Sequence, residues 1–298
     1  MSTFCNVCVE LGVPLAEDKT EGPSTRITYL GITIDTEKMQ IQSPENKIIE
    51  LLQKLNDTSN RKKITLKQLQ SLCGSLAFCA RALPAGRAFS RRLYIACQRG
   101  KKTHHLIRIS KDILNDISIW KIFLENYNEI YYILDDEWLS SSVLNLFTDS
   151  AGGIGGGCGI YFNGKWSYLP WPMYWKEDVF RDITYLEMIP IALAIYLWGS
   201  IWQRKKIMFH SDNQSVVKII NSCSSKSPLV MSLVRHIVLW SLLGSFHIKT
   251  VHIPGYKNVF ADLISRGKFQ KYKELAPCAE PHTTLVPTDF WTILDQKC

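Results

Sequence analysis

The chain has 298 residues, a formal net charge of +8 and a hydrophobic content of 46%. This length allows about two domains, and the hydrophobic content excludes a disordered chain. The positive charge is moderate and is by itself weak evidence for a polyanionic partner.

The first 44 residues are predicted to form strands and turns, with residues 27–35 as an alternating strand and Gly31 as a bulge. After Pro44 the apolar spacing becomes helical. A second helix is predicted to begin at Thr65, where Gln68 completes a capping box, and to end at Pro84. A third helix is predicted over residues 112–127. Basic residues crowd the segment between the last two helices, and these are Arg81, Arg87, Arg91, Arg92, Arg99, Lys101 and Lys102.

Residues 129–142 are expected to be a linker with a local acidic cluster. From residue 143 strands and helices alternate. Strands are predicted at 143–149, 160–162, 165–171, 207–211 and 246–253, and helices at 184–202, from 213, at 228–243 and from 258. The order predicts an α/β fold in which an antiparallel three-stranded meander is extended by two strands through helical crossovers, with helices on the sheet faces. Residues 267–298 contain three prolines and are expected to be a loosely packed tail.

Two segments have alternative interpretations that the sequence argues against. The glycine run between Gly152 and Gly159 lacks the order of a phosphate-binding loop and leads into a strand, so a hairpin turn is expected. Residues 189–202 are apolar but are interrupted by Pro190 and Gly199, so a buried helix is expected instead of a membrane span.

The nine cysteines are odd in number, and no signal peptide opens the chain. Free thiols in a reducing compartment are therefore expected, with an intracellular location in cytoplasm or nucleus and no secretion. Cys5 and Cys8 have metal-ligand spacing, but no second pair follows before Cys73, which favours half-buried thiols over a zinc site.

Four acidic residues stand at the ends of the predicted strands or starts of the predicted helices: Asp149, Glu187, Asp212 and Asp262. Carboxylates brought together repel one another unless cations neutralise them. Oxygen ligands of this type suit Mg²⁺ or Mn²⁺, and paired ions of this kind serve in-line attack on a phosphodiester. Because ligands gather where strands end and helices begin, the four side chains are expected to converge.

Each acid taken singly also has an ordinary structural explanation. Asp149 could be a turn residue before the glycines. Glu187 could complete a capping box with Thr184, and Asp212 could cap the helix that follows it. Asp262 could form a helical pair with Arg266, four residues later.

Residues 143–266 resemble the ribonuclease H domain of retroelement reverse transcriptases. The resemblance rests on Thr148-Asp149-Ser150, Leu186-Glu187, Ser211-Asp212-Asn213, Ile253-Pro254-Gly255 and the segment from Asn258 to Arg266. The ending Ala261-Asp262-Leu263-Ile264-Ser265-Arg266 is similar to the form in long-terminal-repeat and DIRS-type elements. These are four motifs in order over about 120 residues, with Ile253-Pro254-Gly255 and the segment that follows it counted as one, and together they make a specific pattern. The resemblance implies a ribonuclease H-like mixed five-stranded sheet with flanking helices.

The N-terminal part resembles the end of a reverse-transcriptase palm with its primer-side hairpin over residues 1–44, and a helical thumb or connection over residues 45–128. The similar segments are Gly12 to Pro23, Tyr29-Leu30-Gly31-Ile32, Leu69 to Gly74, and Pro84-Ala85-Gly86-Arg87 with Arg91-Arg92. Polymerising carboxylates are not found before Leu11, so this chain is not expected to polymerise DNA alone. Asp135-Asp136 lies after the thumb and is assigned to solvated linker charge.

The resemblance implies hydrolysis of the RNA strand of RNA–DNA hybrids, with two Mg²⁺ or Mn²⁺ ions held by Asp149, Glu187, Asp212 and Asp262, and Asp149 bridging both ions. Ser150, Asn213 and Gln214 are candidate contacts to the hybrid. Arg87, Arg91 and Arg92 are candidate phosphate contacts, or else a solvated basic face. The polymerase portion that this chain lacks is a candidate partner; a membrane is not expected, and oligomeric state is left open.

Two further points qualify this expectation. The loop where many ribonucleases H carry a mobile His holds Tyr256 and Lys257 here, and His252 is assigned to the strand, so slow turnover is expected. The alternative functions are a non-catalytic nucleic-acid-binding remnant of a retrotransposon, and another nuclease of the same fold, such as an integrase or a junction resolvase. Those enzymes use a different set and spacing of acids.

Overall fold

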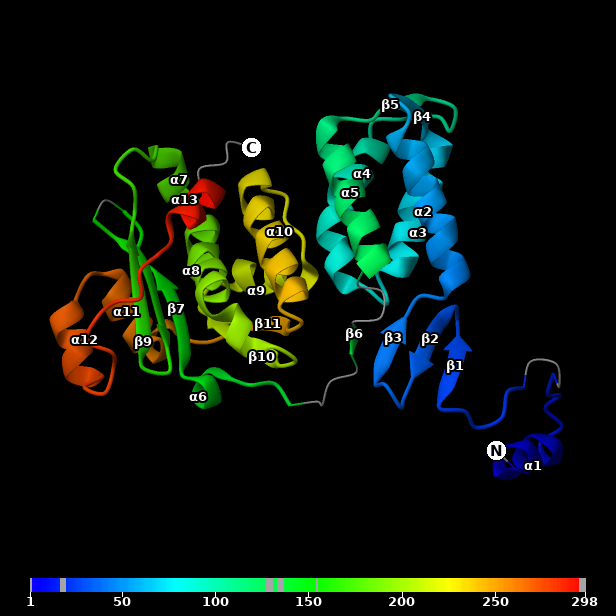
Figure 1. Cartoon of the computed structure of the whole chain (residues 1–298), viewed down its shortest axis with the longest axis horizontal. Coiled ribbons are helices and arrows are strands. Elements are labelled where there is room, and N and C mark those ends of the chain that lie inside the picture. The colour runs from blue at the N-terminus through cyan, green and yellow to red at the C-terminus, as the bar shows by residue number, and fades with distance from the viewer. Residues whose placement is uncertain (1, 17–19, 127–130, 133–136, 154, 295–298) are drawn as a thin grey trace.

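The computed structural model describes residues 2–16, 20–126, 131–132, 137–153 and 155–294 of the chain. The described residues form a mixed α/β structure with four separately hydrogen-bonded sheets. Figure 1 shows a small sheet and a helical bundle at one end of the molecule and a second body of strands and helices at the other. The predicted acidic linker residues 133–136 lie outside the described part.

The N-terminal sheet contains β1 (Arg26–Tyr29), β2 (Ile32–Asp35), β3 (Gln40–Gln42) and β6 (Tyr131–Tyr132), all antiparallel. Gly31 is not a bulge: Leu30 and Gly31, both with positive φ, form the turn between β1 and β2. The prediction of strands and turns from the first residue is also wrong, because α1 (Ser2–Glu10) is helical. A helix satisfies its backbone hydrogen bonds internally, so a segment without a strand partner can form one.

The helical bundle contains α2 (Glu45–Ser59), α3 (Leu66–Cys79), α4 (Arg91–Cys97) and α5 (Lys111–Asn126), with a 3₁₀ helix, η2 (Pro84–Phe89), and a short ladder of β4 (Lys63–Thr65) with β5 (Leu106–Arg108). The predicted capping box is confirmed. The Gln68 backbone N–H donates to Thr65 Oγ1 at 3.2 Å, and the Thr65 N–H donates to Gln68 Oε1 at 2.9 Å. The helix ends at Cys79, earlier than the predicted Pro84, which instead begins η2.

The second body begins with α6 (Ser141–Leu144) and the antiparallel meander β7 (Leu146–Ser150), β8 (Gly157–Phe162) and β9 (Lys165–Pro170). Two further strands, β10 (Lys206–Ser211) and β11 (His247–His252), pair in parallel. The predicted order of strands is therefore found, except that Val143 belongs to α6. The five strands form two ladders, and a single five-stranded sheet is not shown, although β7 and β10 are neighbours.

Helices surround these two ladders. They are α7 (Glu177–Arg181), α8 (Ile183–Trp198) with η3 (Gly199–Trp202), α9 (Gln214–Ser222), α10 (Pro228–Leu243), η4 (Gly255–Lys257), α11 (Val259–Ser265), α12 (Phe269–Leu275) and α13 (Thr288–Leu294). The stretch Ile183–Trp202 passes a length and composition test for a membrane span, but 67% of its most apolar window is buried inside the protein. Its packing against β7, β8 and α10 makes it a central helix of this body.

The C-terminal segment packs more closely than its prolines suggested. On α12, Tyr272 is fully buried, with its ring 5.3 Å from that of Trp166. On α13, Phe290 is fully buried against Tyr196 of α8. The expectation of a loose tail is wrong, because large aromatic side chains fix the segment while the prolines only interrupt its helices.

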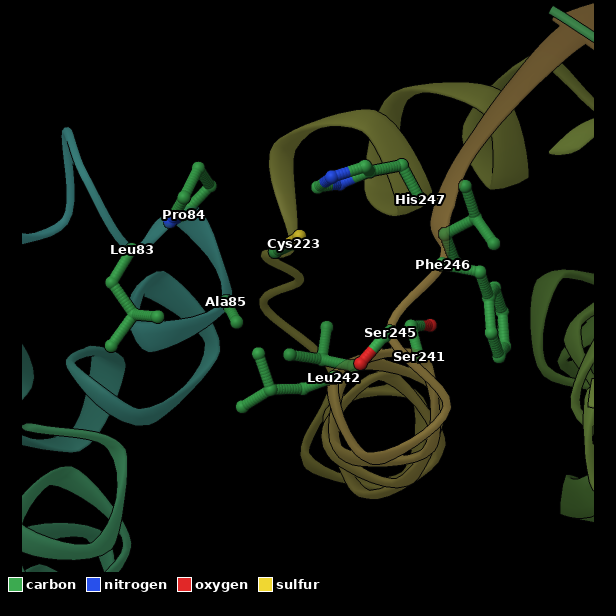
Figure 2. Close-up of a pocket in the computed structure, with 11 residues that line it drawn as sticks. Leu83, Pro84, Ala85, Cys223, Ser241, Leu242, Ser245, Phe246 and His247 are labelled. Atoms are coloured by element: carbon green, nitrogen blue, oxygen red, sulfur yellow. The ribbon is translucent and has the colours of Figure 1, made fainter. Parts of the chain in front are cut away.

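The two bodies meet through η2, α5 and α10. Asp116 on α5 is buried and lies 3.1 Å from Arg92 of the bundle and 3.6 Å from Arg235 on α10. The junction between η2, α10 and β11 also contains an apolar cavity of about 130 Å³. Figure 2 shows Leu83 and Pro84 on one side of it and Leu242 on the other. The junction thus combines a buried charge cluster with incompletely filled apolar packing.

Candidate metal centre

Three of the four predicted acids converge. Asp149, Glu187 and Asp212 each offer a carboxylate oxygen, and these atoms lie within 4.8 Å of one another. Asp149 is on β7, Glu187 is in the second turn of α8, and Asp212 directly follows β10. Exposure increases across the group: Asp149 is 7% exposed, Glu187 is half-buried and Asp212 is exposed. The cluster therefore has one anchored carboxylate and one that faces solvent.

The position of Asp149 depends on a glycine in the next strand. Gly159 on β8 lies opposite Asp149, and a Cβ added there would lie 2.5 Å from both Ala261 O and Ser265 N on α11. Only a residue without a side chain lets α11 approach the meander this closely. The glycine thereby brings α11 against the strand that carries Asp149.

Two residues from the α11 segment hold the Asp149 carboxylate. Ser265 Oγ donates to Asp149 Oδ2 at 2.8 Å, and Asn258 Nδ2 donates to Asp149 Oδ1 at 3.3 Å and to Thr148 O at 2.8 Å. Sequence reasoning assigned neither residue a role. Their separation of seven residues places them on one face of a helix, and that spacing is the signal that could have identified them.

The surroundings of Asp149 and Glu187 disfavour the ionised forms of their carboxyl groups. Burial raises the pKa of Asp149 to about 7, and the neighbouring acids Asp262 and Asp212 add to the increase while Ser265 opposes it. Burial raises the pKa of Glu187 to about 8, with a further contribution from Asp149 and opposing hydrogen bonds from Ser150. Desolvation and like charge both disfavour ionised carboxylates, so positive charge placed here would be stabilised.

Asp262 is not part of the three-residue group. Its Oδ1 forms an ion pair with Arg266 Nε at 2.6 Å, the helical pair that was the ordinary alternative for this residue. Asp262 is still close enough to raise the pKa of Asp149. The described structure therefore shows three gathered carboxylates, with the fourth nearby and paired to a cation.

The ordinary alternatives for the other three acids are wrong. Asp149 lies within a strand and is not a turn residue. The N-cap of α8 is Asp182, which accepts from the Tyr185 N–H at 3.0 Å, so Glu187 does not complete a capping box with Thr184. The N-cap of α9 is Asn213, so Asp212 does not cap it.

The candidate nucleic-acid contacts differ in whether their side chains already form hydrogen bonds within the protein. Ser150 hydrogen-bonds Glu187, and Asn213 Oδ1 accepts from the backbone N–H groups of Ser215 and Val216 at 2.9 and 3.3 Å. Gln214 is exposed at the start of α9.

The loop after β11 approaches the acid group. His252 ends β11, as predicted. Gly255 lies beside Asp212, and a Cβ added at Gly255 would be 3.0 Å from Asp212 Oδ2.

The donor set fits a hard divalent cation. All three gathered ligands are carboxylates, and Mg²⁺ and Mn²⁺ prefer oxygen donors. Among the described residues, Asp149, Glu187 and Asp212 form the group of acids, histidines or cysteines whose spacing is compatible with a metal ion. Such an ion would also neutralise the repulsion that raises the pKa values of Asp149 and Glu187.

Comparison with known proteins gives little direct guidance. No protein-family profile matches the chain, and no curated protein matches it. Among solved structures, a foamy viral protease-reverse transcriptase in complex with an RNA/DNA hybrid is similar over 81% of this chain and 31% of its own, with 13% sequence identity and a TM-score of 0.30. This chain thus spans about a third of that protein's length.

Proposed function

We propose that the chain is a metal-dependent endonuclease that hydrolyses the RNA strand of RNA–DNA hybrids. The observation that carries the proposal is the convergence of Asp149, Glu187 and Asp212 to within 4.8 Å from three separate elements. The ribonuclease H-like motifs around these residues supply the reaction class. In this proposal β7 to β11 are the strands of the ribonuclease H-like sheet, divided into two ladders.

The proposed metal ligands have distinct tasks. Asp149 would be the fixed ligand, because Ser265 and Asn258 restrain both of its oxygens. Glu187, held by Ser150, would close the inner side of the site, and the exposed Asp212 would face the substrate. Asp262 would join when a second ion or the substrate draws it from Arg266. Bound divalent ions supply a water of lowered pKa for attack on phosphorus and stabilise the leaving oxygen.

Recognition of the hybrid would involve the start of α9. Gln214 is the exposed candidate for contact with a 2′-hydroxyl in the minor groove. Asn213 uses Oδ1 as the helix cap, which leaves its amide N–H₂ as a donor. Phosphate contacts from basic residues of the bundle would add affinity that depends on salt.

The division of the chain belongs to the same proposal. Residues 1–44 would be a palm remnant with its hairpin, 45–128 a thumb-like bundle, 129–142 a linker and 143–266 the nuclease, with 267–298 packed on it. We further propose an intracellular location and association with a polypeptide that carries a polymerase active site.

The test is cleavage of an end-labelled RNA–DNA hybrid by the purified chain, with and without Mg²⁺, alongside Asp149→Asn and Asp212→Asn. We expect cleavage of the RNA strand that requires Mg²⁺ and is lost in both variants. Asp182→Asn is a matched control, because Asp182 caps α8 but lies outside the acid group. Cleavage that persists in both site variants would exclude this site. Binding of the hybrid without cleavage by the parent protein would favour the non-catalytic remnant.

A further inference from the structure

A second cavity lies where the bundle meets the second body. Its volume is about 310 Å³, and it is lined by Ala77, Ala80, Arg87, Ser90, Arg91, Tyr94 and Ser224. All of these residues belong to the bundle except Ser224, which follows the end of α9. The cavity thus lies between two basic side chains, Arg87 and Arg91, and the end of α9, the helix that begins beside the acid group.

The two arginines of this cavity have no acidic partner among the described residues. Arg91 Nε is buried without a hydrogen-bond acceptor. Within the described part of the chain neither Arg87 nor Arg91 forms an ion pair, whereas Arg92 is paired with Asp116 at 3.1 Å. A buried donor without an acceptor is unfavourable, because its hydrogen bond to water has been lost without replacement. Guanidinium groups match the geometry of phosphate oxygens, which would supply the acceptors.

The backbone that carries the arginines is held rigidly. Gly86, directly before Arg87, packs on the buried Trp120, and a Cβ there would lie 2.2 Å from Trp120 Cη2. Ser90 Oγ, directly before Arg91, donates to Gly86 O at 3.2 Å. A site whose backbone is fixed in advance loses less entropy when it binds.

Helix α9 relates this cavity to the acid group. Asp212 and Asn213 precede the helix, and Ser224 follows it. The eleven steps from Asn213 to Ser224 span roughly 16 Å at about 1.5 Å per step. A duplex advances about 3.4 Å per base pair along its axis. A distance of about 16 Å along that axis therefore corresponds to about five base pairs, and one bound duplex could reach both places.

We propose that Arg87, Arg91 and Ser224 form a subsite for one backbone phosphate of the bound nucleic acid, about five base pairs along the duplex axis from the acid group. The inference rests on the proposed function, because it takes the bound polymer to be the hybrid. In this proposal the three arginines have different roles. Arg87 and Arg91 contact phosphate, whereas Arg92 pairs with Asp116 at the junction and does not. Both bodies contribute to the subsite, so the hybrid would bridge them.

The test measures hybrid binding by the full chain without divalent metal, by fluorescence anisotropy over a range of NaCl concentrations. We expect Arg87→Gln and Arg91→Gln each to weaken binding and to reduce the slope of log affinity against log salt by about 0.9, because each would remove one phosphate contact. The double variant should lose about twice as much slope. Lys271→Gln, on the exposed face of α12, is the matched control and should keep the parent slope.

One further pair of variants tests the place of Ser224 in the subsite. Ser224→Glu should weaken binding of a long hybrid, because it would place a carboxylate beside the guanidinium groups, whereas Ser118→Glu on the exposed face of α5 should not.

The outcomes separate the two proposals. Metal-dependent cleavage together with unchanged salt slopes in the arginine variants would overturn the subsite and leave the nuclease in place. Reduced slopes without cleavage by the parent would support the subsite and overturn the nuclease. Absence of measurable hybrid binding by the parent protein would overturn the subsite.

Discussion

At the scale of single residues, the carboxylate of Asp149 is defined by its hydrogen-bond donors. Ser265 and Asn258 each restrain a different oxygen, so the ligand is oriented before any ion arrives. Loss of a group that orients a metal ligand typically lowers metal affinity about 10- to 100-fold. Function at this site therefore depends on α11 as well as on the three acids.

Removal of the Ser265 hydroxyl should weaken the site without removing a ligand. We expect Ser265→Ala to lower the affinity for Mn²⁺ or the metal-dependent activity about 10- to 100-fold, because Asp149 loses its shortest hydrogen bond. Isothermal titration calorimetry with Mn²⁺ checks the affinity. Ser118→Ala, at an exposed serine of α5, is the control. Equal Mn²⁺ affinities for Ser265→Ala and the parent would contradict the role assigned to the hydroxyl.

At the scale of elements, the approach of α11 to β8 is set by Gly159. We expect Gly159→Ala to destabilise the fold by about 1–3 kcal/mol, because its Cβ would overlap the backbone of α11. It should also reduce Mn²⁺ affinity, since Ser265 and Asn258 would move from Asp149. Urea unfolding and calorimetry measure the two effects. Gly152→Ala is the control, because a Cβ there meets nothing within 4 Å. Unchanged stability in Gly159→Ala would show that the contact is not needed.

Helix α9 begins at a side-chain cap, Asn213, that directly follows Asp212 of the candidate metal site. We expect Asn213→Ala to cost about 1 kcal/mol of stability, because the N–H groups of Ser215 and Val216 lose their acceptor. Asn213→Asp keeps an acceptor and should retain most of the stability. Thermal unfolding of the two variants distinguishes them. If Asn213→Ala proves as stable as Asn213→Asp, the side chain does not cap the helix in solution.

At the scale of the whole molecule, the junction carries a buried acid whose charge is costly. Burial raises the pKa of Asp116 to about 6, although Arg235 and Arg92 lower it and Asp112 raises it further. The folded protein therefore binds this proton more tightly than the unfolded chain. The contribution of Asp116 to stability is fully present below its unfolded pKa of 3.8 and is lost as the pH rises through about 6.

This linkage predicts a pH-dependent difference between Asp116→Asn and the parent. Because asparagine does not titrate, the stability of the variant relative to the parent should increase between about pH 4 and pH 7 and level off above that range. Urea unfolding at several pH values measures the difference. Glu125→Gln, on the same helix and exposed, should show no such trend. Parallel pH profiles for Asp116→Asn and the parent would contradict the raised pKa.

Much of the fold could be predicted because its signals are local. The capping box at Thr65 and Gln68 and the bounds of α10 depend on residues a few positions apart. The errors arose where distant contacts decide. The segment after residue 266 was expected to be loose, yet Tyr272 and Phe290 are buried by aromatic partners far away in sequence.

For the site, the sequence by itself determined which acids stand at strand ends and helix starts, because hydrophobic period and motif order are properties of the chain. Only the tertiary structure decided that Asp149, Glu187 and Asp212 meet, and that Asp262 stays in the local pair with Arg266 that the sequence had offered as an alternative. It likewise decided that Arg92 belongs to the junction and that Ser265 and Asn258 hold Asp149. The physical reason is that the surroundings of Asp149 depend on how separate elements pack, here on the close contact of α11 with Gly159. No local sequence pattern encodes the distance between those two elements.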